Sequence, residues 1–191
     1  MTVIKDGVGT GTVAQVNSIN QLSVEAMVES DAAVGADMGV AWAVDGQAVI
    51  TSGVERTVLI VTNSGIVPVE IGLTFTSVQN NPINSGMVTV IKTYIGTATG
   101  TGGTPKIPVN KNTKFTTLPN VGVTTNSPSI AGVDTEVSQF YFQMQDTIQV
   151  DYASSIVLNQ GGSYRITATG ASGTASGLVS HSVRFINEFH S

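Results

Sequence analysis

The sequence of 191 residues contains no cysteine and little charge. Without cysteine there are no disulfides, thiolate metal ligands or cysteine nucleophiles, and nothing indicates a redox compartment. Charged residues make up only 11% of the chain, less than half of the ~25% that is usual in globular proteins. The polar surface must therefore come from Thr, Ser, Asn, Gln and Gly, which suits a chain that packs in an assembly.

Basic runs are also missing. Eight basic and 13 acidic residues give a net charge of −5, whereas nucleic-acid binding needs clustered Lys and Arg. The nearest approach to a cluster is Lys106, Lys111 and Lys114, and their Gly- and Pro-bounded surroundings favour a solvated loop. We therefore predict no nucleic-acid partner.

Long apolar runs are absent as well. No run approaches the ~18 residues that a membrane-spanning helix needs. The first residues, MTVIKDGVG, lack the basic and apolar regions of a signal peptide. We expect no membrane partner, and synthesis in a cytoplasm without secretion by a standard route.

Apolar and polar residues alternate with a period of two over much of the chain, as in half-buried strands. The clearest example is VPVEIGLTF (67–75), which is predicted to bury Val67, Val69, Ile71, Leu73 and Phe75 on one face. The runs 57–63 and 87–95 are apolar on both faces, as expected for central strands. Short strands separated by turn signals predict an all-β antiparallel sandwich, either jelly-roll or Ig-like.

One segment, EAMVESDAAVGADM (25–38), is a weak helix candidate, because it is short and contains Gly35. The overlapping LSVEAMVE alternates equally well as a strand. Both interpretations remain open from the sequence.

Two further segments differ from the expected core. Residues 1–20 are rich in Gly and Thr, and we predict an extended N-terminal arm before a single sandwich domain at 21–191. Residues 96–134 hold four of the six prolines, and they predict a long loop. That loop either lies across a neighbouring subunit or forms a surface crossover.

The glycines of GVGTGT, which are Gly7, Gly9 and Gly11, resemble a phosphate loop only in part. A dinucleotide fingerprint has the spacing Gly-x-Gly-x-x-Gly and leads into a helix whose N-terminal amides hold the phosphate. Here VAQVNSIN follows without a helical pattern. The glycines are better explained by an arm that turns sharply or lies close to another backbone.

Candidate catalytic residues are few, because there is no Gly-x-Ser-x-Gly motif and the histidines are His181 and His190. His181 shares a face with valines, which favours a core or interface histidine. Asp134 and Glu136 share a face, but two carboxylates alone make a weak metal site. We predict no catalytic residue, metal site or cofactor.

Two aromatic residues, Trp42 and Tyr141, are of the kind that stack on sugars. A core or interface anchor is the commoner role of such residues.

Three stretches resemble small virion structural proteins of tailed bacteriophages. Two of them are TVLIVTNSGIVPVEIGLTF and GTGGTPKIPVNKN. The third is the N-terminal stretch, in which the matching positions are Ile4, Lys5, Asp6, Gly7, Gly9, Gly11, Ala14, Val16 and Leu22. The resemblance implies a capsid decoration, or cement-like, protein built on a β-sandwich, often trimeric and without catalytic residues.

The implied partners are sister subunits, with a trimer favoured, and the major capsid protein or another virion protein, on the capsid exterior of particles made in the bacterial cytoplasm. The residues expected to bind a partner through the arm are Ile4, Lys5, Asp6, Gly7, Gly9, Gly11, Val13 and Val16. The residues expected at a subunit interface are Trp42, His181 and Phe185. The alternatives are a receptor- or carbohydrate-binding sandwich of a tail or fibre, and a small hydrolase that depends on His181.

Overall fold

The computed structural model describes residues 3–5, 13–16, 22–23, 39–81, 88–116, 118–127, 129–142, 146–171 and 176–187. The chain divides into two compact units, Met1–Ser30 and Asp31–Ser191. No helix occurs among the described residues. The helix candidate at 25–38 lies outside them.

The first unit contains three short strands that form an antiparallel sheet. In order they are β1 (Val3–Lys5), β2 (Val13–Val16) and β3 (Leu22–Ser23). The residues that the sequence predicts to lie in an extended arm therefore include a paired β-structure.

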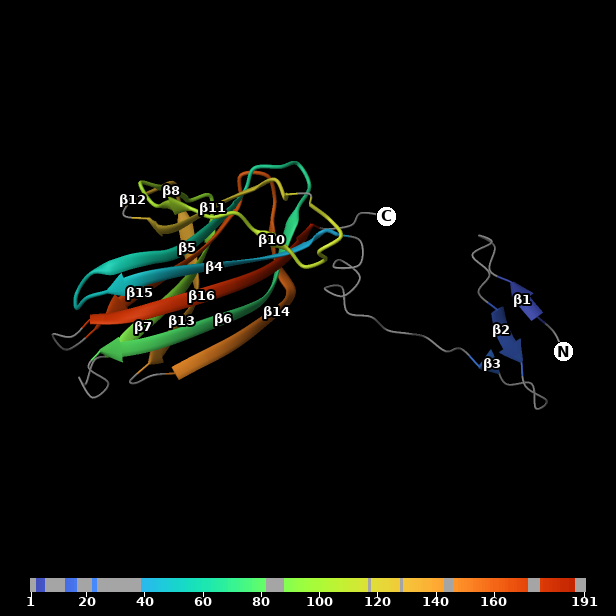
Figure 1. Ribbon diagram of the computed structural model, residues 1–191, viewed down its shortest axis with the longest axis horizontal. Helices are drawn as coiled ribbons and strands as arrows, with labels where there is room; N and C mark the ends of the chain where they lie inside the picture. The colour runs from blue at the N-terminus through green and yellow to red at the C-terminus, as the bar shows by residue number, and fades with distance from the viewer. Residues whose placement is uncertain are drawn as a thin grey trace. The chain divides into compact units, whose positions relative to one another are not determined.

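The second unit is built from eight long antiparallel strands (Figure 1). They are β4 (Ala41–Ile50), β5 (Glu55–Asn63), β6 (Val69–Asn81), β7 (Thr89–Gly96), β13 (Asp134–Phe142), β14 (Asp146–Leu158), β15 (Ser163–Gly170) and β16 (Ser176–Asn187). Their pairing is nested, with β4 beside β16, β5 beside β15, β6 beside β14 and β7 beside β13. This first-with-last winding is that of a jelly roll, so the predicted antiparallel sandwich is confirmed.

The strands form a five-stranded sheet of order β10-β4-β16-β6-β14 and a six-stranded sheet of order β13-β7-β15-β5-β11-β9. The hydrophobic core includes side chains from both sheets, such as Trp42 and Phe185 of the first and Leu59 and Tyr164 of the second. The predicted central strands 57–63 and 87–95 correspond to β5 and β7, each of which has a neighbour on both sides.

The chain between β7 and β13 is not the long loop that its composition predicts. It contains β8 (Thr99–Thr101), β9 (Thr104–Pro105), β10 (Val109–Asn110), β11 (Val121–Ser127) and β12 (Ser129–Ala131). β11 pairs with β5, and β10 pairs with β4. Pro119, one of the prolines that suggested a loop, precedes the first residue of β11 and disturbs none of its backbone pairing.

The single buried face predicted for 67–75 holds only for Val69 and Ile71, because Val67 is 42% exposed before the strand begins and the face changes after Ile71. Between Ile71 and Thr74 β6 advances by three residues, while β16 advances by only two, from Phe185 to Val183. The extra residue is a β-bulge, which moves every following side chain to the opposite face of the strand.

The bulge determines which side chains of β6 enter the core. Thr74 and Thr76 are buried, with exposed fractions of 2% and 4%, whereas Leu73 and Phe75 keep an intermediate exposure. An alternation of apolar letters cannot show this change of register, because the sequence pattern continues unbroken through the bulge.

Gly46 provides a test of how closely β4 approaches β5. A Cβ at this position would lie 2.7 Å from the backbone oxygen of Val58. We expect Gly46→Ala to lower the free energy of unfolding by about 1–3 kcal/mol through overpacking. Urea denaturation measures the change.

The matched control is Gly122→Ala in β11, where a Cβ would meet nothing within 4 Å. It is expected to leave the stability unchanged or slightly raised, because alanine restricts the unfolded chain. Equal losses in the two variants would contradict the close approach at Gly46.

Candidate interaction surfaces

The three residues expected at a subunit interface lie in the core of the single chain. Trp42, His181 and Phe185 have exposed fractions of 2%, 1% and 1%, and the rings of Trp42 and Phe185 stack with centroids 6.1 Å apart. The second sheet of the same sandwich covers the face that they share. A period-two pattern shows that a face is buried but not which chain buries it, and for these residues the interface prediction was wrong.

The buried imidazole of His181 contacts two hydroxyl groups inside this core. Thr76 Oγ1 lies 2.8 Å from Nδ1 and Tyr164 Oη lies 3.1 Å from Nε2, so each ring nitrogen has a hydroxyl partner. Burial lowers the pKa of His181 to about 3. A neutral imidazole without access to solvent cannot exchange protons with a substrate, so His181 offers no route to the hydrolase interpretation.

The buried imidazole makes stability depend on pH. Its pKa is about 3 in the folded chain, against 6.5 for the free group. The unfolded chain therefore binds the extra proton below pH 6.5, and stability falls as the pH decreases from there towards 3. The expected loss is about 1.4 kcal/mol per pH unit once the pH is below 6.5.

His181→Gln removes this titration while keeping hydrogen-bonding groups at the site. We expect the variant to lose about 2–3 kcal/mol less than the parent chain between pH 7 and pH 4.5, as measured by urea denaturation at each pH. Parallel losses in the two proteins would show that His181 does not titrate on unfolding.

Other candidates for chemistry are not brought together. The described residues contain no group of three or more His, Cys, Asp or Glu that could hold a metal ion. The carboxylate of Asp134 instead accepts a hydrogen bond from Arg165. His190 lies outside the described residues. Among the described residues, no helix long and apolar enough to cross a membrane was found.

A charged cluster on the six-stranded sheet was not foreseen from the sequence. Arg165 Nε donates to Asp134 Oδ2 at 2.6 Å, and its guanidinium lies 4.2 Å from the centre of the Tyr94 ring. Arg165 Nη1 is 3.6 Å from Glu55 Oε1. Although Arg165 stands on the polar side of its strand, its exposed fraction is only 8%.

The cluster joins the end of the β7–β13 connection to the sheet, because Asp134 is the first residue of β13. Tyr94 belongs to β7 and Arg165 to β15, two adjacent strands. Burial raises the pKa of Tyr94. The only sequence signal was an arginine within an alternating strand, which does not reveal its partners.

Breaking this buried pair is expected to be costly. Arg165→Met leaves the Asp134 carboxylate half-buried without its partner, and we expect a loss of about 3–5 kcal/mol. Lys92→Met is the matched control, because Lys92 pairs with Glu136 at 2.8 Å but both side chains are about a third exposed. We expect little change there, and a similar effect of both variants on the urea midpoint would refute a structural role for Arg165.

The two sheets end on one side in long strands with a single neighbour. In the described part of the chain, β13 pairs only with β7 and β14 only with β6. Their sequences, DTEVSQFYF and DTIQVDYASSIVL, contain no Lys, Arg or Pro. Natural sheets commonly protect edges with those residues, because open backbone groups pair with other chains.

Exposed apolar side chains accompany these edge strands. Val137 and Tyr141 of β13 are 43% and 67% exposed, and Val157 of β14 is 42% exposed. Val137 occupies a β-bulge between Glu136 and Ser138. We call β13 and β14 together the open side of the sandwich.

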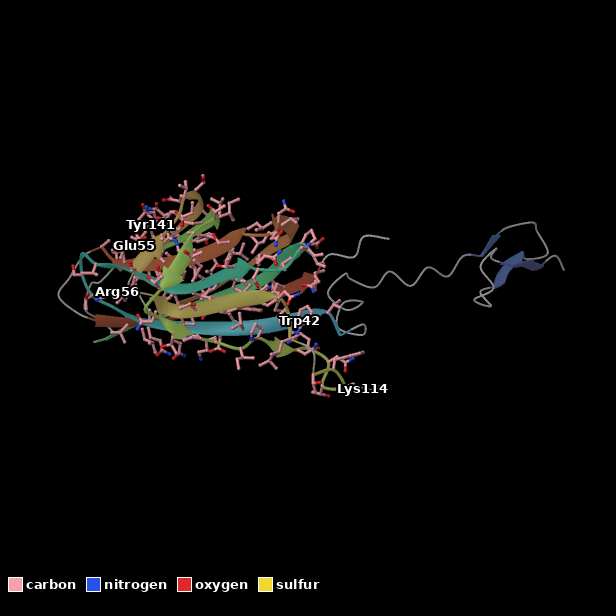
Figure 2. All side chains as sticks on the ribbon, turned by 90° about the horizontal axis from the view of Figure 1, so that it is seen from above. Trp42, Glu55, Arg56, Lys114 and Tyr141 are labelled. Carbon is pink, nitrogen blue, oxygen red and sulfur yellow. The ribbon has the colours of Figure 1, made fainter. Side chains whose placement is uncertain are left out.

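Of the two aromatic residues considered for sugar stacking, the structure leaves one accessible. Trp42 is buried, whereas Tyr141 is exposed on the open side. Figure 2 shows the two towards opposite ends of the sandwich, with Tyr141 at the same end as Glu55 and Arg56. They therefore do not form one binding platform.

The residues expected to bind a partner through the arm are described only in part. Ile4 and Lys5 lie in β1, and Val13 and Val16 lie in β2. The predictions for Asp6, Gly7, Gly9 and Gly11 fall outside the described residues.

The sequence matches no family model, and no curated protein is similar to it in sequence. Among solved structures, a Yersinia pseudotuberculosis-derived mitogen is similar with a TM-score of 0.33 and 10% identity, covering 78% of this chain and 88% of that chain. The decameric BFDV capsid protein has a TM-score of 0.29 and 7% identity, covering 78% and 98%. Desmodium yellow mottle tymovirus has a TM-score of 0.27 and 6% identity, covering 78% and 89%. These TM-scores are low, so the jelly-roll assignment rests on the strand order.

Proposed function

We propose that this chain is a non-enzymatic virion structural protein that decorates the capsid exterior of a tailed bacteriophage and stabilises it through contacts between subunits. The observation that carries the proposal is the open side, where two long strands without Lys, Arg or Pro end the two sheets. Edges of this kind offer open backbone groups that can pair with another chain. A subunit of an assembly can use them for specific pairing.

The composition of the surface supports the same role. Only 11% of the residues are charged, so few surface charges repel other proteins from the exposed strands. Within an assembly, weakly charged contacts repeated over a lattice add up, because each subunit is held at several places at once.

The sister subunit is expected to meet the open side. We propose that β13 and β14 form the contact about a symmetry axis, with a trimer favoured, and that apolar side chains such as Val137 and Tyr141 become buried there. The N-terminal residues 1–20 then bind the major capsid protein or another virion protein.

A lysine on the open side is expected to dissociate the oligomer. In Val137→Lys a charge stands at the edge strand, and its desolvation opposes pairing. Light scattering on a sizing column measures the native mass, and we expect a shift from an oligomer to the monomer.

Val49→Lys is the matched control, because Val49 is 61% exposed on β4, where it pairs with Leu178 of β16 away from the open side. We expect that variant to keep the parent mass. A parent chain that is already monomeric, or equal dissociation by both variants, would refute the open side as the subunit interface.

Removing residues 1–20 tests the capsid contact separately. We expect the truncated chain to keep the jelly roll, because the eight long strands lie beyond Ser30. Its co-sedimentation with phage heads that lack the protein should fall at least tenfold relative to the full chain. Unchanged binding would show that these residues do not hold the capsid.

A further inference from the structure

A second surface of unusual composition lies in the β7–β13 connection. Residues 106–115, which we call the basic strap, carry three of the eight basic residues of the chain and no acidic residue. All three lysines are exposed. Lys106 Nζ lies 3.9 Å from Asp45 Oδ2, and within the described ranges no ion pair involves Lys111 or Lys114.

The basic strap also exposes apolar side chains. Ile107 is 72% exposed, Val109 is 69% exposed and Phe115 is 38% exposed. A chain of net charge −5 thus presents a surface that is both basic and apolar. Such a surface fits an occupant that is acidic and apolar.

Side-chain and backbone contacts hold the strap in an ordered conformation. Asn110 Oδ1 accepts from the backbone N–H of Asn112 at 2.8 Å, and Asn112 Oδ1 accepts from that of Lys114 at 3.0 Å. The backbone N–H of Phe115 donates to the carbonyl of Asn112 at 3.1 Å. Two successive Asx turns therefore fix the loop before any partner arrives.

The strap also forms hydrogen bonds with Gly39 and with Ala41, the first residue of β4. Asn110 Nδ2 donates to the carbonyl of Gly39 at 2.8 Å, and the backbone N–H of Lys111 donates to that of Ala41 at 2.9 Å. The ring of Phe115 lies against Gly39, which has a φ of +74° and no room for a Cβ. Figure 2 shows Lys114 on the same side of the sandwich as Trp42. The strap therefore holds Gly39, the residue that directly follows the segment 31–38 in the sequence.

That preceding chain has the complementary chemistry. Residues 31–38, DAAVGADM, carry two carboxylates, Asp31 and Asp37, and no basic residue. Their other side chains are apolar or small, and Val34 and Met38 are the largest. We propose that residues 31–38 dock on the basic strap of the same chain, with their carboxylates at the lysines and their apolar side chains over Ile107 and Val109.

Tethering favours the same chain over a second copy. Eight residues can span at most about 29 Å when extended, so residues 31–38 remain near the strap once Gly39 is held. A short tether gives an effective concentration on the order of millimolar. A second copy, or an acidic surface of another protein, would need to compete with that concentration.

Disulfide trapping tests the contact directly, because the chain has no cysteine of its own. In the full chain carrying Val34→Cys and Val109→Cys, we expect oxidation to form an intramolecular disulfide in most molecules, seen as a faster non-reducing gel band of unchanged mass. The matched control combines Val34→Cys with Val49→Cys, which is similarly exposed at 61% on the outer side of β4. We expect at least tenfold slower closure there.

Closure at equal rates in the two double variants, or no closure in either, would overturn the docking. Disulfides formed only between chains would overturn the same-chain occupant and would show that the strap takes a neighbouring copy.

Charge exchange provides a second test that does not depend on thiols. Lys111→Glu with Lys114→Glu should raise the amide hydrogen exchange of residues 31–38 at least tenfold, while β5 keeps its protection. Adding Asp31→Lys and Asp37→Lys to that variant should restore the parent rates. No change in the first variant, or no restoration in the second, would contradict the electrostatic contact.

Discussion

The connection between β7 and β13 packs back on its own sandwich, and much of the molecule depends on that constraint. Its strand β11 pairs with β5, and its strand β10 pairs with the first part of β4, at Trp42 and Ala43. Asp134, at the end of the connection, pairs with Arg165 on the outer side of the six-stranded sheet. The edges formed by β4 and β5 thus have partners from the connection over part of their length, whereas β13 and β14 each have a single neighbour among the described strands.

We propose different roles for the two sides of the sandwich. The basic strap is exposed near the start of β4, and its chemistry complements residues 31–38, which precede that strand. On the open side the exposed residues accompany strands with a single partner. An edge strand offers backbone hydrogen bonds in a fixed register. A charged and apolar strap attracts a partner but does not fix the register of the contact. The edge is therefore the surface better suited to a symmetric subunit contact.

The sequence predicted the parts of the fold that follow from local alternation. The all-β class, the antiparallel sandwich and the interior positions of β5 and β7 were all predicted, because side chains that alternate along a strand report its two faces. The alternation did not predict the bulge in β6, because one extra residue moves Thr74 to the other face of the strand without changing the pattern of apolar residues. Local alternation also failed to predict the strands of the β7–β13 connection. β11 is stabilised by pairing with β5, and such pairing between distant segments leaves no pattern in the local sequence.

The interface residues show the same limit for the candidate site. Trp42 and His181 had the character of buried or contact residues, and the structure places them in the core. Which chain covers a buried face depends on the packing of two sheets, which no single strand encodes. In the sequence, nothing distinguishes Val137 and Tyr141 from other strand residues. They become candidate contact residues only because β13 lies at the edge of its sheet.

Quantitative mass spectrometry of purified virions of the proposed phage tests the proposed decoration role most directly. The account predicts that the chain is a component of the particle, with a copy number of the same order as that of the major capsid protein. Absence from the virion, or presence in only a few copies per particle, would contradict a role in decorating the capsid lattice.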